Sequence, residues 1–103
     1  MIKHVSTEKE FDEIIASNNV VVDFYASWCA PCRALAPILE DIDAELKNIL
    51  IVKVDVDEAT ILASRYGVMS IPTLLFFKNG TLVHEQIGLL PPNQLLDLFK
   101  THL

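Results

Sequence analysis

Cys29 and Cys32 are the only cysteines of the chain and lie three residues apart in the segment WCAPC. Two cysteines at this spacing form either a reversible redox pair or half of a four-ligand zinc site. A zinc site needs two further ligands, but the chain has no third cysteine, and its histidines are scattered at His4, His84 and His102. The spacing therefore favours redox chemistry, with a zinc half-site and a pair without chemical function as alternatives. We expect the three histidines at the surface.

The composition predicts one compact domain spanning residues 1–103, because a chain of 103 residues is long enough for a single core and too short for two. Asp and Glu total 14 against 8 Lys and Arg. This negative charge gives neither a phosphate-binding face nor attraction to an anionic bilayer, so nucleic acid and membranes are not expected as partners. No apolar run approaches the roughly 18 residues of a membrane helix or resembles a secretory leader. We therefore expect a cytoplasmic protein.

The segments on either side of the cysteines predict a strand and a helix. Residues 20–26 are β-branched and aromatic on both alternating faces, which is typical of a central strand covered on two sides. After the cysteines, apolar residues recur at helical spacing from Leu35 to Leu46, and Pro37 inside this helix predicts a kink. A second buried strand follows at residues 49–54. The order strand, helix, strand implies a parallel pair with a right-handed crossover.

The remaining segments predict shorter elements. Residues 2–5 form a short strand, and Thr7 with Glu10 has the spacing of a capping box at the start of a helix. Asp57 is expected to cap a short helix that stops at Gly67. Strands 73–77 and 82–86 flank an Asn-Gly turn, and Pro91-Pro92 opens a last helix. The predicted fold is α/β, a mixed central sheet of about five strands flanked by about four helices.

The cysteines lie just beyond the carboxyl end of the 20–26 strand and at the amino end of the long helix. Unpaired N–H groups and the positive end of the helix dipole stabilise a thiolate on Cys29. Cys32 follows one turn later on the same side, so the two sulfurs can form a reversible disulfide. Cys29 is the expected nucleophile because it is nearer the helix start and more exposed, whereas Cys32 faces the protein.

Asp23 interrupts the strand that is expected to be buried on both faces. An ionised carboxylate there costs several kcal/mol, so we expect Asp23 to titrate at a raised pH. The alternative is a carboxylate at the strand end in contact with water. Lys53 alternates with valines in the 49–54 strand, and a lysine in such a pattern is more often an edge or surface residue.

The segment DFYASWCAPC, residues 23–32, resembles the active-site segment of the thioredoxin family. Further family landmarks lie in the same order along the chain: Pro37, Lys53, Ser70-Ile71-Pro72-Thr73, Lys78-Asn79-Gly80 and Gly88. The resemblance covers essentially the whole chain. It implies the thioredoxin fold and a thiol-disulfide oxidoreductase.

The resemblance also implies roles for individual residues. Cys29 would form a mixed disulfide with the target, and Cys32 would resolve it by attacking Cys29. Asp23, linked with Lys53, would be the acid/base for Cys32. The Ile71-Pro72 bond would be cis. A shallow apolar groove for an extended target strand would then be formed by Trp28, Ala30, Pro31, Ile71, Pro72, Ile87 and Gly88. For Trp28 and Ile71 the alternative is ordinary core packing.

Three functional hypotheses follow from the resemblance. The first is a monomeric cytosolic reductase of protein disulfides that needs no cofactor or metal, takes part in electron transport and redox homeostasis, and is recycled by an NADPH-dependent flavoprotein, thioredoxin reductase. The second is an oxidant or isomerase, although Pro31 replaces the histidine common in oxidising relatives. The third is a non-catalytic binding subunit. The chain departs from the usual family pattern at three positions: Tyr25 replaces tryptophan or phenylalanine, Ala30 replaces glycine, and Arg33 replaces lysine.

Overall fold

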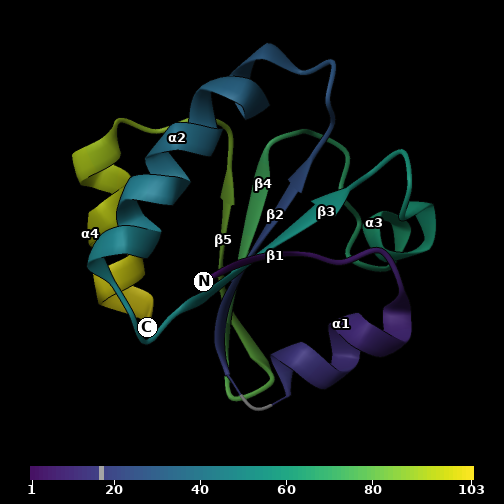
Figure 1. Ribbon diagram of the computed structural model, residues 1–103. Helices are drawn as coiled ribbons and strands as arrows, with labels where there is room; N and C mark the ends of the chain where they lie inside the picture. The colour runs from purple at the N-terminus through teal and green to yellow at the C-terminus, as the bar shows by residue number, and fades with distance from the viewer. Residues whose placement is uncertain (17) are drawn as a thin grey trace.

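The computed structural model describes residues 1–16 and 18–103, which form a mixed sheet covered by helices (Figure 1). The elements in chain order are β1 (Ile2–His4), α1 (Glu8–Ile15), β2 (Asn19–Tyr25), α2 (Ala30–Glu45), β3 (Leu50–Asp55), α3 (Thr60–Arg65), β4 (Thr73–Lys78), β5 (Thr81–Ile87) and α4 (Pro92–His102). The strand order is β1-β3-β2-β4-β5. β2 and β3 are parallel, whereas β4 and β5 are antiparallel. The predicted architecture is confirmed.

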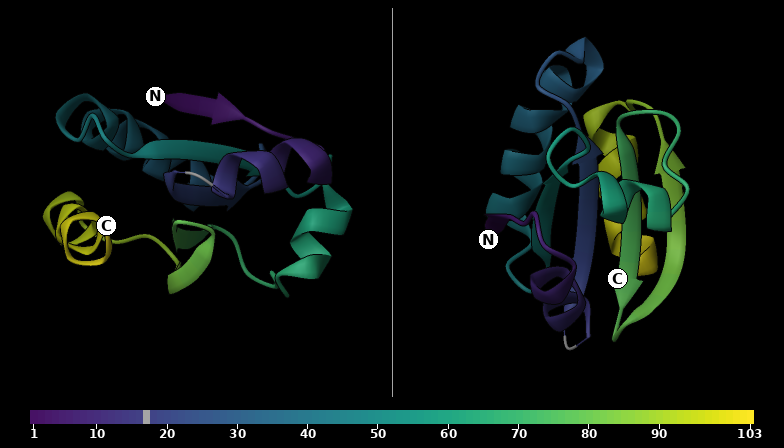
Figure 2. Two further views of the ribbon diagram at one scale, coloured as in Figure 1. Left: turned by 90° about the horizontal axis from the view of Figure 1, so that it is seen from below. Right: turned by 90° about the vertical axis from the view of Figure 1, so that its right-hand side faces the viewer.

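Helices cover both faces of the sheet, with α1 and α3 on one side and α2 and α4 on the other (Figure 2). Phe11 of α1 and Leu62 of α3 pack in the first core, and Leu35 of α2 and Phe99 of α4 pack in the second. The side chains of β2 alternate between these two cores, and residues 20–24 are fully buried. The prediction of a central strand covered on two sides is therefore confirmed.

The start of α2 immediately follows the end of β2. Cys29 is the N-cap residue of the helix, and its side chain accepts a hydrogen bond from the backbone N–H of Cys32. Pro31 lies in the first turn, where the missing N–H removes no helical hydrogen bond. Pro37 lies inside the helix, as expected. The strand and the helix together place both cysteines at the carboxyl edge of the parallel strands.

The segment before α3 differs from the expectation. The helix begins at Thr60, its N-cap is Ala59, and no side chain caps it, so the prediction that Asp57 caps this helix is wrong. The reason is a turn in which the backbone N–H groups of Glu58 and Ala59 both donate to the carbonyl of Asp55, which moves the helix start beyond Asp57. The predicted stop is confirmed, since Gly67 has a φ of 64°.

Local signals at α1 and in the hairpin lead to the expected structures. Thr7 is the N-cap of α1 and accepts a hydrogen bond from the backbone N–H of Glu10 at 3.3 Å. The second half of the predicted capping box is not seen among the described residues, since the Glu10 carboxylate lies 3.8 Å from the ammonium of Lys3 instead of bonding the backbone N–H of Thr7. Asn79 and Gly80 have φ values of 52° and 83°, the left-handed pair that a tight hairpin between β4 and β5 requires.

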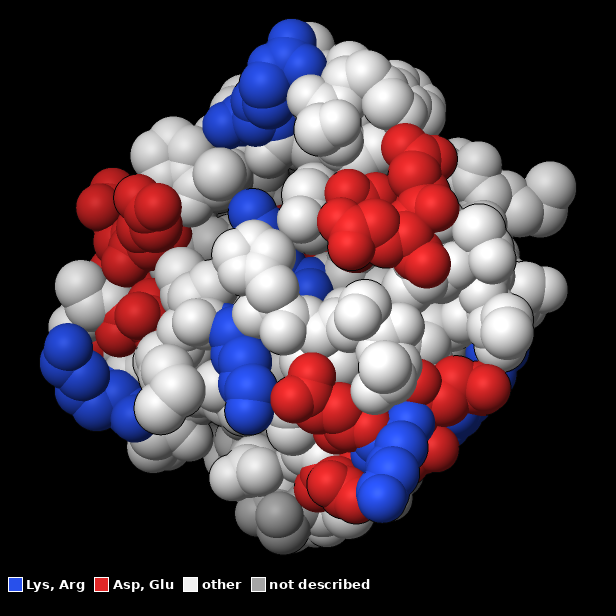
Figure 3. Space-filling model, turned by 45° about the vertical axis from the view of Figure 1, so that its right-hand side comes forward, with Lys and Arg blue, Asp and Glu red and all other residues white. Residues whose placement is uncertain are grey.

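The molecular surface offers no extended basic region on the face shown in Figure 3, where basic side chains lie singly or beside acidic ones. A phosphate backbone would find no continuous line of positive charge on this face. None of the helices that the structure describes is long and apolar enough to cross a membrane.

Two histidines join α4 to the edge strand. The rings of His84 on β5 and His102 on α4 stack with centroids 4.1 Å apart, and Phe76 contacts both rings. The expected surface position holds fully for His4 alone, because His84 and His102 are only partly exposed where α4 packs on β5. Desolvation by burial, and then the charge of the neighbouring His102, lower the pKa of His84.

We predict that His84→Phe reduces the loss of stability at acid pH. The unfolded chain binds a proton at His84 more readily than the folded chain does. The contribution of His84 to the free energy of unfolding is therefore fully present above about pH 6.5 and is lost as the pH falls. A phenyl ring keeps the ring contacts and cannot be protonated. Urea unfolding at about pH 7.5 and about pH 5.5 should show a smaller difference in the free energy of unfolding than in the wild type. The control is His4→Gln at an exposed ring, and an equal change in both variants would contradict the prediction.

Candidate active site

The two cysteines are free thiols at the first turn of α2. The backbone N–H of Cys32 donates to the Sγ of Cys29 at 3.3 Å, and the Cys29 thiol donates to the carbonyl of Ile71 at 3.8 Å. Cys29 is 6% exposed and Cys32 is 3% exposed. Cys29 is therefore the more exposed thiol, as predicted, but the difference is small because Val56 and Ile71 pack against the pair.

Burial and charge act on the thiol of Cys32. Desolvation is the largest cause that raises its pKa, and the neighbouring Cys29 and Asp23 act in the same direction. Cys32 therefore remains protonated at neutral pH unless a base removes its proton. A thiol of this kind suits the resolving role rather than the first attack.

Asp23 is completely buried in β2. Desolvation raises its pKa from 3.8 to about 6, and the positive charge of Lys53 opposes this effect. Neither carboxylate oxygen accepts a hydrogen bond from the residues that the structure describes. The predicted raised titration is confirmed, and the alternative of a carboxylate in contact with water is wrong.

Lys53 lies directly opposite Asp23 in the register of β2 and β3. Its Nζ is 3.8 Å from Oδ2 of Asp23, and its side chain is only 14% exposed. The alternative of an edge or surface lysine is therefore wrong. The pairing of β3 with β1 on its other side explains why, since β3 is not an edge strand.

The Ile71-Pro72 peptide bond is cis, as the resemblance implies. The backbone N–H of Gly88 donates to the carbonyl of Pro72 at 2.9 Å, and Ile87 pairs with Thr73 in the register of β4 and β5. This pairing brings Ile87 and Gly88 beside the segment whose carbonyl at Ile71 faces Cys29.

The residues expected to bind a target differ in exposure. Trp28 is 67% exposed and Ile87 is 56% exposed, whereas Ile71 is partly buried against the cysteines. Ala30 and Pro31 are exposed at the start of α2. Core packing is thus the wrong interpretation for Trp28, and Ile71 combines packing with a contact to Cys29.

Sequence reasoning missed three residues at this edge. Asp57 accepts a hydrogen bond from Nε1 of Trp28 at 2.8 Å, Val56 packs against the cysteines, and Met69 is 96% exposed two residues before Ile71. An acidic residue that follows a buried strand can indicate a binding site at the carboxyl edge of the sheet. Asp57 fits this pattern, but its sequence position predicts a helix cap. Neither Val56 nor Met69 carries a distinguishing pattern in the sequence.

The zinc alternative finds no support at this site. Among residues 1–16 and 18–103, no group of three or more histidine, cysteine, aspartate and glutamate side chains could hold a metal ion. The chemistry that the geometry supports is thiol exchange between a nucleophile at a helix start and a buried second thiol.

Comparison with known proteins gives consistent results. The model of the thioredoxin family matches residues 2–101. A thioredoxin of Mycoplasmoides gallisepticum is 44% identical over 100 residues, which cover 96% of this chain and 100% of that protein. The solved structure of a Plasmodium falciparum thioredoxin is 35% identical with a TM-score of 0.91, covering 98% of this chain and 99% of the other.

A further solved structure concerns the thiol-resolving mechanism of a yeast mitochondrial 1-Cys peroxiredoxin through the glutathione and thioredoxin systems. The matching chain is 32% identical with a TM-score of 0.91, covering 97% of this chain and 94% of its own length.

We predict that Asp23→Asn stabilises the protein at neutral pH but not in acid. The pKa of Asp23 is about 6 in the folded chain, against the ordinary 3.8. As the pH rises from 3.8 to about 6, the carboxyl ionises in the unfolded chain before it does in the folded chain, so the free energy of unfolding falls. The shift corresponds to about 3 kcal/mol at pH 7.5. Urea unfolding at about pH 7.5 and about pH 4 measures the gain. Asp97→Asn, at an exposed position of α4, is the matched control. If Asp23→Asn stabilised the protein equally at both pH values, desolvation of the ionised carboxyl would not be the cause.

Proposed function

The chain belongs to the thioredoxin family and is a thiol-disulfide oxidoreductase, and from this premise we propose that it reduces disulfides of target proteins with Cys29 as nucleophile and Cys32 as resolving thiol. The observation that carries this division is the different surroundings of the two sulfurs: Sγ of Cys29 accepts the N–H of Cys32 at the first turn of α2, whereas burial raises the pKa of the Cys32 thiol.

In the first step the Cys29 thiolate attacks one sulfur of the target disulfide. The target S–S bond breaks, a mixed disulfide forms with Cys29, and the other target sulfur leaves as a thiolate that takes a proton from water. The N–H of Cys32 and the free N–H groups of the helix start stabilise the attacking anion. These donors are fixed before the target binds, so no rearrangement precedes the attack.

In the second step the Asp23 carboxylate takes the proton of Cys32, and the Cys32 thiolate attacks Sγ of Cys29. The mixed disulfide breaks, the second target thiolate leaves, and a Cys29-Cys32 disulfide holds the oxidised state. The pair has given two electrons to the target. Support comes from the raised pKa of Asp23, about 6, which makes it a stronger base than an ordinary carboxylate and still leaves it ionised at neutral pH.

The target is proposed to lie as an extended strand across the apolar edge formed by Trp28, Ala30, Pro31, Ile71, Pro72, Ile87 and Gly88. Exposure of Trp28 and Ile87, and the position of Ile71 beside Cys29, support this placement. Pairing with backbone gives affinity that does not depend on the target sequence, which suits a reductase with many targets.

Turnover needs a reductant for the oxidised pair, and we assign this role to an NADPH-dependent flavoprotein, thioredoxin reductase. The similar chain in the structure that concerns the thiol-resolving mechanism of a yeast 1-Cys peroxiredoxin supports a protein target for this chain as well. We further propose a monomer with one domain over residues 1–103 that acts in the cytoplasm. Membership of the thioredoxin family favours a catalytic disulfide reductase over a non-catalytic binding subunit.

Insulin reduction with dithiothreitol tests the chemistry directly. The wild type should accelerate the precipitation of the insulin B chain, and Cys29→Ser should abolish the acceleration because no nucleophile remains. Cys32→Ser should instead accumulate a mixed disulfide with the target, which mass spectrometry detects. Equal rates for the wild type and Cys29→Ser would eliminate catalysis. A measured reduction potential then distinguishes a reductase from an oxidant or isomerase.

The acid/base role of Asp23 predicts a change in the pH profile of resolution. In the wild type the rate of mixed-disulfide resolution should rise through about pH 6 as the carboxylate forms. Asp23→Asn should lose this rise and slow resolution by about 100-fold, the low end of general-base contributions. Stopped-flow resolution of a preformed mixed disulfide measures the step. An unchanged profile in Asp23→Asn would remove the assignment and leave the cysteine roles intact.

A further inference from the structure

Three side chains form a row across the sheet beneath the active site. His4 of β1 pairs with Lys53 of β3, and Lys53 pairs with Asp23 of β2. Tyr25 follows Asp23 by two residues on the same strand and therefore lies on the same face of the sheet. The register thus brings the ring of Tyr25 close to the ion pair of Lys53 and Asp23.

The Lys53 ammonium has two partners in this arrangement. Its Nζ lies 4.6 Å from the centroid of the Tyr25 ring and 3.8 Å from Oδ2 of Asp23. The first distance is within the range of a cation–π interaction. A lysine has a long flexible stem and a strongly hydrated head that tends to extend into water. The aromatic face supplies an attraction that opposes this tendency on the protein side.

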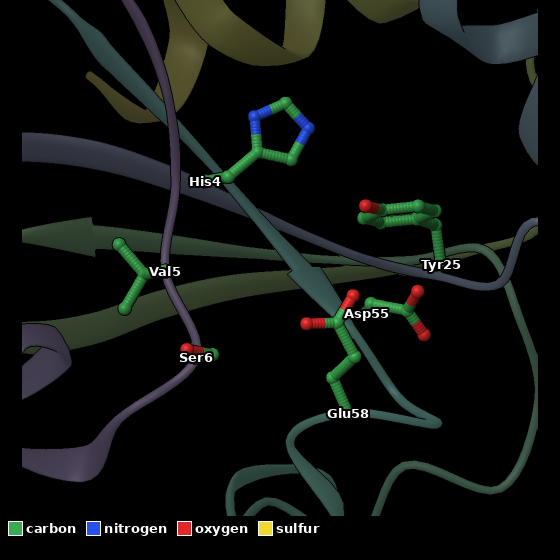
Figure 4. A pocket seen from close by; sticks show the side chains of 6 residues that line it. All are labelled: His4, Val5, Ser6, Tyr25, Asp55 and Glu58. Carbon is green, nitrogen blue, oxygen red and sulfur yellow. The ribbon is translucent and has the colours of Figure 1, made fainter.

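Two carboxylates, those of Asp55 and Glu58, place negative charge near the Tyr25 ring. Tyr25 lines a cavity of about 100 Å³ together with His4, Val5, Ser6, Asp55 and Glu58. Figure 4 shows the carboxylates of Asp55 and Glu58 directed toward the Tyr25 ring. Asp55 also follows Lys53 by two residues on the same face of β3. Without the ring contact, the ammonium could turn outward to these acids.

Tyr25 also packs against the buried cluster that contains the cysteines, formed by Ala26, Cys29 and Cys32. The same residue therefore lies against the cluster of the reacting pair and holds its ring at the lysine that accompanies the buried carboxylate. The position is one of the three at which this chain departs from the usual family residues.

We propose that Tyr25 is a positioning residue of the active site: the face of its ring holds the Lys53 ammonium beside Asp23 and keeps the ion pair closed next to Cys32. This inference rests on the proposed function in which Asp23 serves Cys32. The ring itself neither donates nor accepts a proton. It acts through Lys53, whose charge favours the ionised form of the carboxyl.

The charged and titratable groups around the ring are consistent with a neutral phenol. Asp55, Glu58 and Asp23 place negative charge near the hydroxyl, and the edge of the His4 ring lies with its centroid 6.3 Å away. Burial, followed by these three carboxylates, raises the pKa of Tyr25. The ring thus stays uncharged over the pH range in which the thiols react.

The test follows the titration of the Asp23 carboxyl in the reduced protein by ¹³C NMR, a readout that needs no target and no turnover. Tyr25→Leu keeps an apolar side chain but removes the ring, and it should raise the midpoint by about half a unit to one unit. Tyr25→Phe keeps the ring face and should titrate like the wild type. A Phe variant that behaves like the Leu variant would overturn the assignment, because the hydroxyl would then be the acting group.

A double-mutant cycle with Lys53→Met separates positioning from a change in solvent access. If the ring acts through the ammonium, Tyr25→Leu should cause no upward shift in the Lys53→Met background. An equal shift in both backgrounds would overturn the proposal. Trp28→Leu, which removes another aromatic ring of the same edge, is the matched control, and an equal shift there would also overturn it.

Thermal unfolding of each variant confirms that the fold is retained, and the Phe variant keeps the test valid if the Leu variant unfolds. The two levels of inference fail separately. Loss of the Cys29-dependent insulin reduction would remove the proposed function while the Asp23 titration could still show the coupling. Absence of the coupling would remove the role of Tyr25 and leave the reduction by Cys29 and Cys32 unaffected.

Discussion

The buried carboxyl of Asp23 is the constraint on which the rest of the site depends. It lies in a strand covered on both faces, where water cannot solvate its charge, and the ammonium of Lys53 is 3.8 Å from its Oδ2. A group in this position costs stability in its ionised form. The cost is tolerable because the surrounding sheet and the two cores hold the strand in place, and the result is a base with a pKa of about 6 beside a buried thiol.

The same architecture makes the two cysteines unequal. Cys29 is the N-cap of α2, and its sulfur accepts the backbone N–H of Cys32, whereas Cys32 itself lies one turn later in the helix. The difference in exposure between them is small. The division of work that we propose for them therefore depends on hydrogen bonding and on the charge of Asp23 more than on access to solvent.

The surface around the pair has a different character from the interior. Trp28, Met69 and Ile87 expose apolar area, whereas the valines and the phenylalanine of β2 are completely buried. The hydrogen bond from Trp28 to Asp57 fixes one side of this area, and the backbone bond from Gly88 to Pro72 fixes the other. An exposed but ordered apolar edge beside a nucleophile is suited to the transient binding of extended chains.

The sequence by itself determined the elements, the class of fold and the chemistry. Alternating and helical periodicity identified β2 and α2, the Asn-Gly turn identified the β4–β5 hairpin, and the spacing of Cys29 and Cys32 indicated a redox pair, because each of these features is local. Asp57 shows the limit of local patterns: the sequence predicts a cap, but a turn at Asp55 leaves its carboxylate to Trp28.

Tertiary structure alone decided which distant side chains meet. The pairing of β3 with β2 placed Lys53 opposite Asp23 and brought the Tyr25 ring to the ammonium. The pairing of β4 with β2 put the carbonyl of Ile71, just before β4, beside Cys29. No periodicity contains this information, because strand register depends on the packing of the whole sheet and not on any single segment. Asp23 likewise loses its contact with water only when both cores cover β2. The sequence could therefore indicate that the pKa of Asp23 is raised, but the tertiary structure causes the shift.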